Sequence, residues 1–391
     1  MIFGTRAPPR SAAALAACLC AVSSAASAAE GPTDEEIRSA RPGQLLRVWP
    51  LEGGAPATAK AYRVLYRSTG LNGEPIPVTG AIIFPDAPAP REGRHVVAWA
   101  HPTTGVVERC APTLLPDLSG TIPGLKDMLA RGWVIAATDY QGLGTPGMHP
   151  YLVGESEART VLDIVRAARQ LPDSGATERF AVWGHSQGGH AALFTGELAA
   201  AYAPELKLVG VAAAAPATYL DALFEADRGS IGGNALTAMA LLSWARIFGL
   251  SLDGLLVPGV EPSFRKVAES CIESIADEVH IAQVEQPLER AFLEADPTRL
   301  PPWRAVMDRN TPGQAAAGAP VLLAQGTADD IVEPEITRRF ADQLCRGGAL
   351  VRLIMMEGVD HGFAGQDSAL TAVAWMADRF AGRQAPNDCG R

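Results

Sequence analysis

The sequence predicts an α/β fold in which a mostly parallel central sheet carries helices on both faces. Six short apolar runs lack the polar alternation of a half-buried strand, as is typical of strands buried on both faces; they span residues 95–100, 133–137, 180–183, 208–212, 320–324 and 350–356. Helical patterns lie between these runs, the clearest at 155–170. Alternation of this kind predicts parallel strands joined by helical crossovers.

Two further strands are predicted ahead of the first buried run. Residues 61–67 alternate with period two, and a second strand is expected at 77–84. Gly70 and Gly73 lie between them, so the two strands are expected to pair as an antiparallel edge. Residues 31–54 are rich in proline, glycine and charge, and we interpret them as a lead-in segment.

Residues 218–312 break the strand–helix alternation. They contain an apolar helical segment at 235–250 and a second helical pattern at 264–294, with no run typical of a buried strand. We therefore expect a mostly helical cap, or lid, inserted between the two parts of the core, 30–217 and 313–391. The alternative is an elaborated crossover between two strands.

The first 29 residues have the pattern of a signal peptide. Arg6 and Arg10 precede an apolar run, and Ala26-Ser27-Ala28 is a small-residue cleavage site. A secreted or periplasmic protein is expected. The alternative is a lipoprotein, because a sequence that resembles a lipobox ends at Cys18.

Composition excludes several classes of protein. The 391 residues carry a formal net charge of −10, which argues against nucleic acid as a partner and against a polybasic membrane anchor. After the signal, no stretch is apolar and long enough to span a bilayer. There is no C-x-x-C or H-x-x-x-H pair, so a metal site is not indicated.

Four cysteines follow the signal: Cys110, Cys271, Cys345 and Cys389. An even number in an oxidising compartment suggests two disulfides, and four cysteines permit three pairings. Our hypothesis is Cys110–Cys271 with Cys345–Cys389, the second bond holding the C-terminal tail. One bridge with two buried thiols is the alternative.

The motif that carries chemistry is Gly184-His185-Ser186-Gln187-Gly188, a G-x-S-x-G sequence between a predicted strand and a predicted helix. In such a nucleophile elbow the serine occupies a strained turn, and glycines let strand and helix pass close together. The N-terminus of the helix directs its N–H groups at the position where an oxyanion would develop.

A serine nucleophile needs a base, and in this type of fold the partners follow in the order serine, acid, histidine. Three of the seven histidines lie beyond Ser186. His190 lies one turn along the elbow helix, which directs it away from the serine, and His280 belongs to the predicted cap. His361 lies between the last apolar run and the final helix, so we expect it to be the base.

Two neighbouring aspartates are the main candidates for the acid. Asp329 is the third residue after Gly326, in a loop that follows a buried strand, and we prefer it. Asp330 is expected to face solvent or to cap the next helix. Asp360 is a remote third candidate because it adjoins His361 in sequence.

The oxyanion needs two backbone donors. One is expected from the N–H of Gln187, the residue after the nucleophile, and the other from the loop 100–105. Within that loop we prefer Thr103 to Thr104. The glycine-rich loop 139–144 is expected to line the pocket.

Taken together, these segments resemble the secretory lipase family of α/β-hydrolases, from about residue 40 to the C-terminus. The resemblance rests on His101-Pro-Thr-Thr-Gly105, Cys110-Ala-Pro112, Asp139 to Thr145, Gly184 to Gly189 and Gly-Thr-Ala-Asp329. It implies the α/β-hydrolase fold, a Ser–Asp–His triad, a helical lid, a disulfide from Cys110, no cofactor and ester hydrolysis. The sequence departs from the family at Pro102, where the usual residue is glycine.

The resulting functional hypothesis is a secreted serine lipase or esterase acting through an acyl-enzyme. Its substrate would be a small-molecule or lipid ester, with transient contact of the cap at a lipid interface. The alternatives are a short-chain or aryl carboxylesterase and a polyester hydrolase with the same triad. More distant alternatives are a serine peptidase and a non-catalytic binding protein. The oligomeric state is not predicted.

Overall fold

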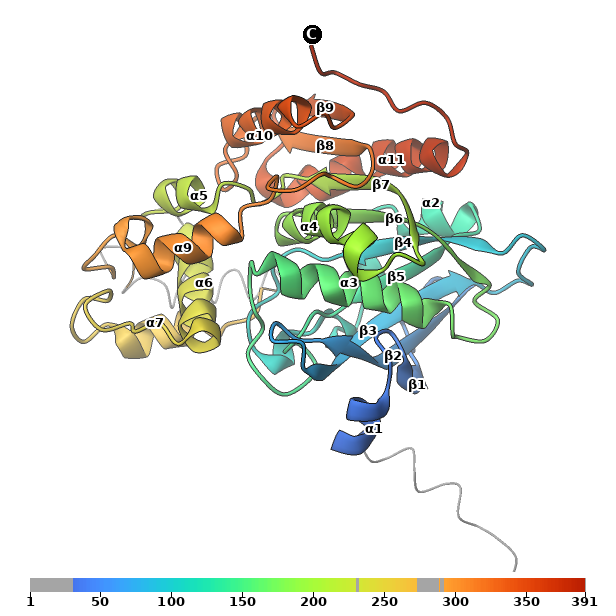
Figure 1. Cartoon of the computed structure of the whole chain (residues 1–391), viewed down its shortest axis with the longest axis horizontal. Helices are drawn as coiled ribbons and strands as arrows, with labels where there is room; N and C mark the ends of the chain where they lie inside the picture. Colours follow the sequence, from blue (N-terminus) through green and yellow to red (C-terminus); the bar gives the residue numbers. More distant parts are fainter. Residues whose placement is uncertain (1–30, 230–231, 273–287, 289–291, 391) are drawn as a thin grey trace, which may run out of the picture.

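The computed structural model describes residues 31–229, 232–272, 288 and 292–390, and its core is a nine-stranded sheet (Figure 1). The predicted signal peptide and Cys18 lie outside the described residues. The strands are β1 (Leu45–Pro50), β2 (Ala59–Thr69), β3 (Pro75–Pro85), β4 (Arg94–Ala100), β5 (Val134–Thr138), β6 (Ala176–His185), β7 (Lys207–Ala214), β8 (Val321–Gly326) and β9 (Val351–Met356). Their order in the sheet is β1-β2-β3-β5-β4-β6-β7-β8-β9.

Each of the six predicted buried runs forms one of the strands β4 to β9, and these six pair in parallel. The predicted antiparallel pair is confirmed as β2 and β3, and β3 joins the parallel part by pairing antiparallel with β5. The predicted fold class, a mostly parallel α/β sheet, is therefore confirmed.

The segment expected to be a lead-in is partly structured. It contains helix α1 (Asp34–Ser39), which begins with a capping box between Thr33 and Glu36. It also contains β1, which lies at the edge of the sheet and pairs with β2. No residue of β1 is fully buried, so this edge strand lacks the apolar run that predicts the central strands.

Helices cover both faces of the sheet, as predicted (Figure 1). One face carries α3 (Gly154–Ala168), α4 (Gln187–Tyr202) and α10 (Pro334–Arg346), and the other carries α2 (Leu125–Ala130) and α11 (His361–Phe380). Each face packs its own apolar cluster. Short 3-10 helices complete the core at Glu108–Cys110, Pro112–Leu114 and Ser119–Thr121.

Among the described residues, four helices lie between β7 and β8 and gather on one side of the sheet (Figure 1). They are α5 (Leu220–Ala226), α6 (Gly233–Phe248), α7 (Glu261–Ala268) and α9 (Pro301–Arg309), with a 3-10 turn at Pro297–Arg299. We refer to 218–312 as the cap. The helix expected at 264–294 already ends at Ala268 as α7, and most of its remainder lies outside the described residues.

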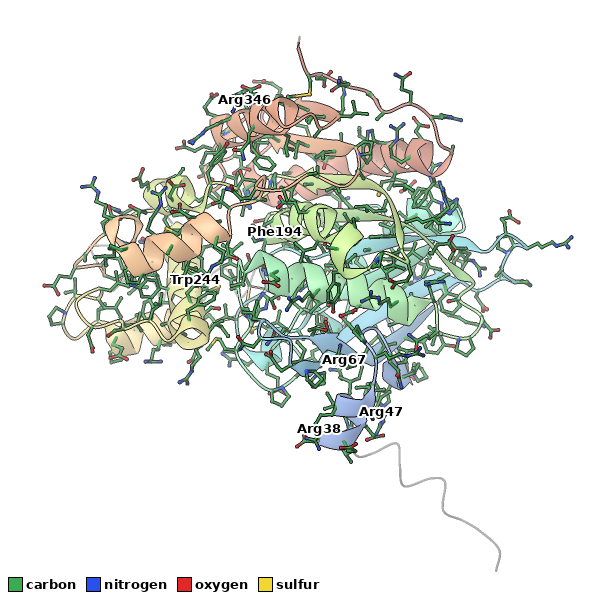
Figure 2. All side chains as sticks on the ribbon, in the orientation of Figure 1. Arg38, Arg47, Arg67, Phe194, Trp244 and Arg346 are labelled. Atoms are coloured by element: carbon green, nitrogen blue, oxygen red, sulfur yellow. A yellow bond between two sulfur atoms is a disulfide. The ribbon has the colours of Figure 1, made fainter. Side chains whose placement is uncertain are left out.

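Both hypothesised disulfides are present. Cys110–Cys271 has a Cα–Cα distance of 5.3 Å and ties the loop after β4 to the chain just beyond α7. Cys345–Cys389, the yellow bond near Arg346 in Figure 2, joins α10 to the C-terminal tail. Over the part of the chain that is described, no helix is long and apolar enough to cross a membrane.

Candidate active site

Ser186 lies at the turn between β6 and α4, with φ 56° and ψ −117°. A side chain at positive φ is strained, and the neighbouring glycines explain why the turn is possible. A Cβ on Gly188 would lie 1.9 Å from the carbonyl oxygen of Ala100, and one on Gly184 would lie 2.0 Å from the carbonyl oxygen of Gly188. The strand and helix therefore pass too close for any other residue at these two positions.

His361 and Asp329 lie in series behind the serine. The Nε2 atom of His361 is 2.9 Å from Oγ of Ser186. The Nδ1 atom of the same ring is 2.9 Å from Oδ2 of Asp329 and 3.1 Å from Oδ1. His361 is the first residue of α11, and Asp329 lies in the loop after β8. Parallel strands thus bring three residues far apart in the sequence to one edge of the sheet.

Asp329 is 4% exposed, and its carboxylate is held by several donors. Its Oδ1 accepts from the N–H groups of Ile331 and Val332, and its Oδ2 accepts from Nε2 of Gln325. Burial by itself raises the pKa of Asp329, but the His361 ring and these donors outweigh it and lower the pKa below its usual 3.8. The group facing His361 is therefore an ionised carboxylate at neutral pH.

The competing residues point elsewhere. Asp330 is exposed, and Asp360 caps α11 by accepting from the N–H of Phe363. His190 contacts Glu157 at 2.6 Å and the carbonyl oxygen of Asn310 at 2.7 Å, away from the serine. His280 lies outside the described residues.

The two expected oxyanion donors have N–H groups without another partner. Gln187 is the first residue of α4, and Thr103 lies in the loop after β4. Within the described residues neither N–H donates to another protein group. The hydroxyl of Thr103 pairs with that of Tyr151 at 2.8 Å, whereas Thr104 is buried and its carbonyl oxygen accepts from the N–H of Ile272.

The pattern of the family described as "Secretory lipase" matches residues 122–388, more than half of the chain. The chain belongs to the secretory lipase family. The resemblance to this family that the sequence motifs indicated is therefore confirmed.

Curated relatives are similar to this chain over most of its length. A probable inactive lipase of Mycobacterium tuberculosis is 26% identical over 88% of this chain and 79% of its own length. Lipase A of Arthroderma benhamiae is 24% identical over 85% of this chain and 73% of its own length. A secreted triacylglycerol lipase of Malassezia globosa is 24% identical over 84% of this chain and 75% of its own length. Family membership and these relatives support a hydrolase that acts on esters.

Solved structures show the same fold. Lipase A of Candida antarctica, in its closed state, superposes with a TM-score of 0.76 at 17% identity and covers 91% of this chain and 86% of its own. The rice cell wall degrading esterase LipA from Xanthomonas oryzae gives a TM-score of 0.71 at 20% identity, covering 88% of this chain and 100% of its own. The α/β-hydrolase fold expected of a secretory lipase family member is thus confirmed. Membership of a secretory family and the two disulfides are consistent with a secreted protein.

A small pocket of about 30 Å³ opens at Ser186. Its walls come from the start of α4, the loop before α3 and the cap, and most of its side chains are apolar, among them Leu152, Leu220, Leu223, Phe224 and Leu236. Asp227 also lines it, and burial, followed by the charge of Asp329, raises the pKa of Asp227 well above 3.8. This carboxyl group therefore lies in a wall whose side chains are mostly apolar.

No residue of the loop 139–144 is among those that line the pocket at Ser186, in contrast to the expected role of this loop as a pocket wall. Asp139 is buried and accepts from the hydroxyls of Thr79 and Thr113 and from the N–H of Thr113. Its carboxylate joins β3 to the segment after β4 and thereby fixes the loop.

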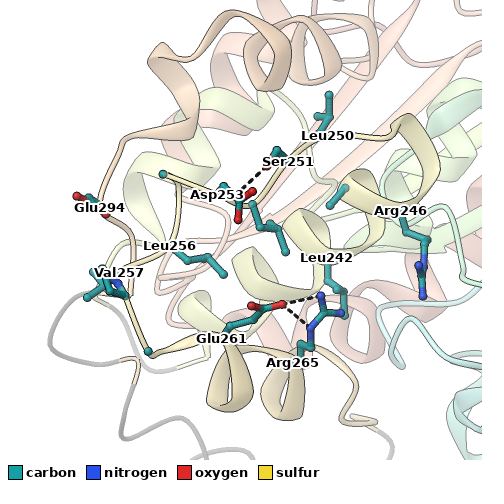
Figure 3. Close-up of a pocket in the computed structure, with 15 residues that line it drawn as sticks. Leu242, Arg246, Leu250, Ser251, Asp253, Leu256, Val257, Glu261, Arg265 and Glu294 are labelled. Carbon is teal, nitrogen blue, oxygen red and sulfur yellow. Dashed lines mark hydrogen bonds and ion pairs between the residues drawn. The ribbon is translucent and has the colours of Figure 1, made fainter.

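Two further hollows exist in the described part of the molecule. One, of about 260 Å³, is lined by the loop 101–104, by His185 and by Gly362 and Gln366 at the start of α11. The other, of about 530 Å³, lies within the cap between α6 and α7 (Figure 3), with the ion pair of Glu261 and Arg265 at its edge. Ser186 is not among its lining residues.

Three buried groups around the serine were missed from the sequence. His185 donates from Nε2 to the carbonyl oxygen of His361 at 2.9 Å, and burial, with the neighbouring His361 ring, lowers its pKa to about 3. His149 and Glu157 both contact the side chain of Gln187. Residue type gives no signal for these contacts, because each joins segments that meet only in the folded chain.

Among the described residues, no group of three or more histidine, cysteine, aspartate or glutamate side chains could hold a metal ion.

A hydroxyl, a neutral imidazole and a carboxylate in series can transfer the hydroxyl proton to the ring and so produce a nucleophile.

Proposed function

We propose that this protein is a secreted serine esterase or lipase that cleaves carboxylic esters through an acyl-enzyme. The observation that carries the proposal is the hydrogen-bonded series of Ser186, His361 and Asp329 at a strand-to-helix turn. Membership of the secretory lipase family supports the same reaction class.

In the proposed mechanism Ser186 attacks the ester carbonyl while Nε2 of His361 takes its proton. Asp329 holds the ring with Nδ1–H directed at the carboxylate and stabilises the imidazolium that forms. The N–H groups of Gln187 and Thr103 then stabilise the oxyanion, and the N-terminal end of α4 adds a favourable dipole. His361 returns the proton to the leaving alcohol, and water resolves the acyl-enzyme by the same steps.

The hollows suggest how the ester lies. The leaving oxygen must approach Nε2 of His361, and the hollow of about 260 Å³ lies beside the residues that follow this histidine. We therefore place the alcohol part there. The acyl part then extends toward the apolar pocket that opens at Ser186 between the core and the cap.

Replacement of the nucleophile tests the proposal. Ser186→Ala should lose nearly all turnover of a p-nitrophenyl ester and all labelling by a fluorophosphonate, while circular dichroism and the unfolding temperature stay close to those of the parent. A fully active variant would end the proposal. A parent protein that neither turns over esters nor reacts with the probe would favour the non-catalytic alternative, for which the inactive lipase among the relatives provides a precedent.

A series of acyl chains distinguishes the ester classes. A lipase should prefer long chains and gain activity at an oil–water interface, whereas a short-chain or aryl carboxylesterase should be fastest with acetyl or butyryl esters in solution. Release of monomers from a polyester film would identify a polyester hydrolase.

We also propose that residues 1–29 are a signal peptide and that 218–312 form a cap over the serine. The mass of the mature N-terminus decides between cleavage near Ala28 and lipid attachment at Cys18. In either case the mature protein is placed outside the cytoplasm.

A further inference from the structure

The cap helix α6 holds a short buried segment, His149 to Tyr151, by three hydrogen bonds. Oγ of Ser243 accepts from the N–H of Tyr151 at 3.0 Å and donates to the carbonyl oxygen of His149 at 2.6 Å. Nε1 of Trp244, labelled in Figure 2, donates to the carbonyl oxygen of Tyr151 at 2.8 Å. Ser243 and Trp244 are each 0% exposed, so these bonds form without competition from water.

The Tyr151 end of this segment holds the side chain of Thr103. The two hydroxyls are 2.8 Å apart, and Tyr151 is 3% exposed. Thr103 lies in the loop after β4, and its N–H is one of the two proposed oxyanion donors. The hydroxyl is carried by Cβ, which is bonded directly to Cα, so holding it limits the rotation of the backbone that carries this N–H.

The His149 end holds the side chain of Gln187. Nδ1 of His149 faces the carbonyl oxygen of Gln141 at 3.0 Å and must donate there, so its Nε2 is the acceptor for the Gln187 amide at 2.7 Å. Burial lowers the pKa of His149 to about 4, which keeps the ring neutral at ordinary pH. The N–H of Gln187 is the other proposed oxyanion donor.

Glu157 of α3 accepts a hydrogen bond from the same amide nitrogen. Its Oε1 accepts from Nε2 of Gln187 at 2.8 Å and from the N–H of Leu152 at 3.2 Å, and its Oε2 faces Nδ1 of His190 at 2.6 Å. Glu157 and His190 are each 0% exposed. The first turn of the elbow helix is therefore held through two side chains, Gln187 and His190, by one buried carboxyl group.

We propose that the segment 149–151, with Glu157, positions both oxyanion donors and that α6 sets its place, so that the geometry of the oxyanion hole depends on the cap. Tyr151, His149, Glu157 and Ser243 are positioning residues in this proposal, which rests on the proposed esterase function. Displacement of a catalytic group by about 1 Å can cost about a hundredfold in rate, so small shifts of this segment matter.

A double-mutant cycle between Tyr151 and Thr103 tests the route to the first donor. Tyr151→Phe keeps the ring beside the pocket, and Thr103→Ala keeps the N–H, while each removes one partner of the hydrogen bond. Each single variant should lose about tenfold in kcat with little change in KM, less than the 10²–10³ that loss of a whole oxyanion donor costs. The double variant should be no slower than the slower single variant.

Ser243→Ala tests the route from the cap. The residue does not line the pocket at Ser186, yet kcat should fall by roughly fivefold to tenfold because both hydrogen bonds to the segment are lost. The matched control is Thr195→Ala, which removes a buried hydroxyl bonded to the carbonyl oxygen of Ala191 on the elbow helix itself. The control should lose some stability and keep its kcat.

Binding of a transition-state analogue separates positioning from general damage. The affinity for a boronic acid that forms a tetrahedral adduct with Ser186 should fall in parallel with kcat/KM, whereas the affinity for the carboxylic acid product should not. Additive losses in the cycle, or a Ser243→Ala variant with the kcat of the Thr195→Ala control, would overturn the inference. Failure of the parent protein to react with a fluorophosphonate would instead overturn the proposed function.

Discussion

At the residue scale, the strained backbone of Ser186 is stabilised by its surroundings. A non-glycine residue at positive φ costs about 1–3 kcal/mol, and the site offsets this through the hydrogen bonds of the turn. The N–H of Ser186 donates to the carbonyl oxygen of Ala214 at 2.9 Å, and its carbonyl oxygen accepts from His190 and Ala217. The strain therefore presents the hydroxyl at the edge of the sheet, within 2.9 Å of Nε2 of His361.

The neighbouring aspartates provide a matched test of the acid. Asp329→Asn should lower kcat by about 10⁴-fold, because an amide no longer selects the Nδ1–H tautomer of His361 and does not stabilise the imidazolium. Asp330→Asn changes the same residue type one position away, at an exposed site, and should keep kcat within about twofold. Both are measured with a p-nitrophenyl ester at saturating substrate. Equal losses in the two variants, or a loss confined to Asp330→Asn, would contradict the assignment.

Chain order and motif are sufficient to predict Ser186, His361 and Asp329 as one group, because parallel strands end at the same edge of the sheet. They are insufficient for Glu157. Its position in the first turn of α3 suggests a helix-dipole role, but the structure buries it against the elbow helix. That contact depends on how α3 and α4 pack. No local pattern encodes this packing.

At the scale of elements, a disulfide joins the cap to the chain just after the loop that carries Thr103, one of the two proposed oxyanion donors. Cys110 follows the loop 101–105, and Cys271 follows α7 in the cap. The N–H of Ile272, the residue after Cys271, donates to the carbonyl oxygen of Thr104 at 2.9 Å, so a hydrogen bond next to the disulfide also holds the loop itself. The other disulfide joins α10 to the C-terminal tail. In that tail the N–H of Asp388 donates to the carbonyl oxygen of Val351 in β9.

The two disulfides should therefore differ in their effect on activity. Replacing Cys110 and Cys271 by alanine should lower stability by about 2–5 kcal/mol and also lower kcat, because the loop that carries Thr103 loses its link to the cap. Replacing Cys345 and Cys389 should lower stability alone. Denaturant unfolding and ester turnover at a temperature where both variants are folded measure the two effects. Equal kcat in the two variants would contradict the expected link.

The central strands are predictable because short continuous apolar runs are typical of strands buried on both faces of a parallel sheet. The cap is less predictable. Its apolar helix α6 stands out, but α7 is only eight residues long and ends at Ala268 beside a disulfide, which periodicity does not reveal. The edge strand β1 is missed for the related reason that its side chains are only partly buried.

At the scale of the whole molecule, buried titratable groups make the stability depend on pH. Burial lowers the pKa of four histidines, that of His101 and His149 to about 4, that of His185 to about 3, and that of His95 in the same direction. Burial raises the pKa of three aspartates, Asp139, Asp163 and Asp227. The two sets act in opposite directions. The aspartates lower the free energy of unfolding as the pH rises above the ordinary carboxyl pKa, and the histidines lower it as the pH falls below 6.5.

Acid destabilisation by the histidines can be isolated in His185→Gln. Between the ordinary histidine pKa of about 6.5 and the native values near 4, the unfolded chain binds protons that the native state does not, so the free energy of unfolding should fall as the pH falls. Each such histidine contributes about 1.4 kcal/mol per pH unit well inside this window. Glutamine can still donate to the carbonyl oxygen of His361 but does not titrate. Urea unfolding at about pH 7, 6 and 5 should therefore give a lower stability for the variant at pH 7 but a shallower decline toward pH 5. Parallel curves for parent and variant would show that His185 takes up protons in the native state as it does in the unfolded chain, and would contradict its burial as a neutral donor.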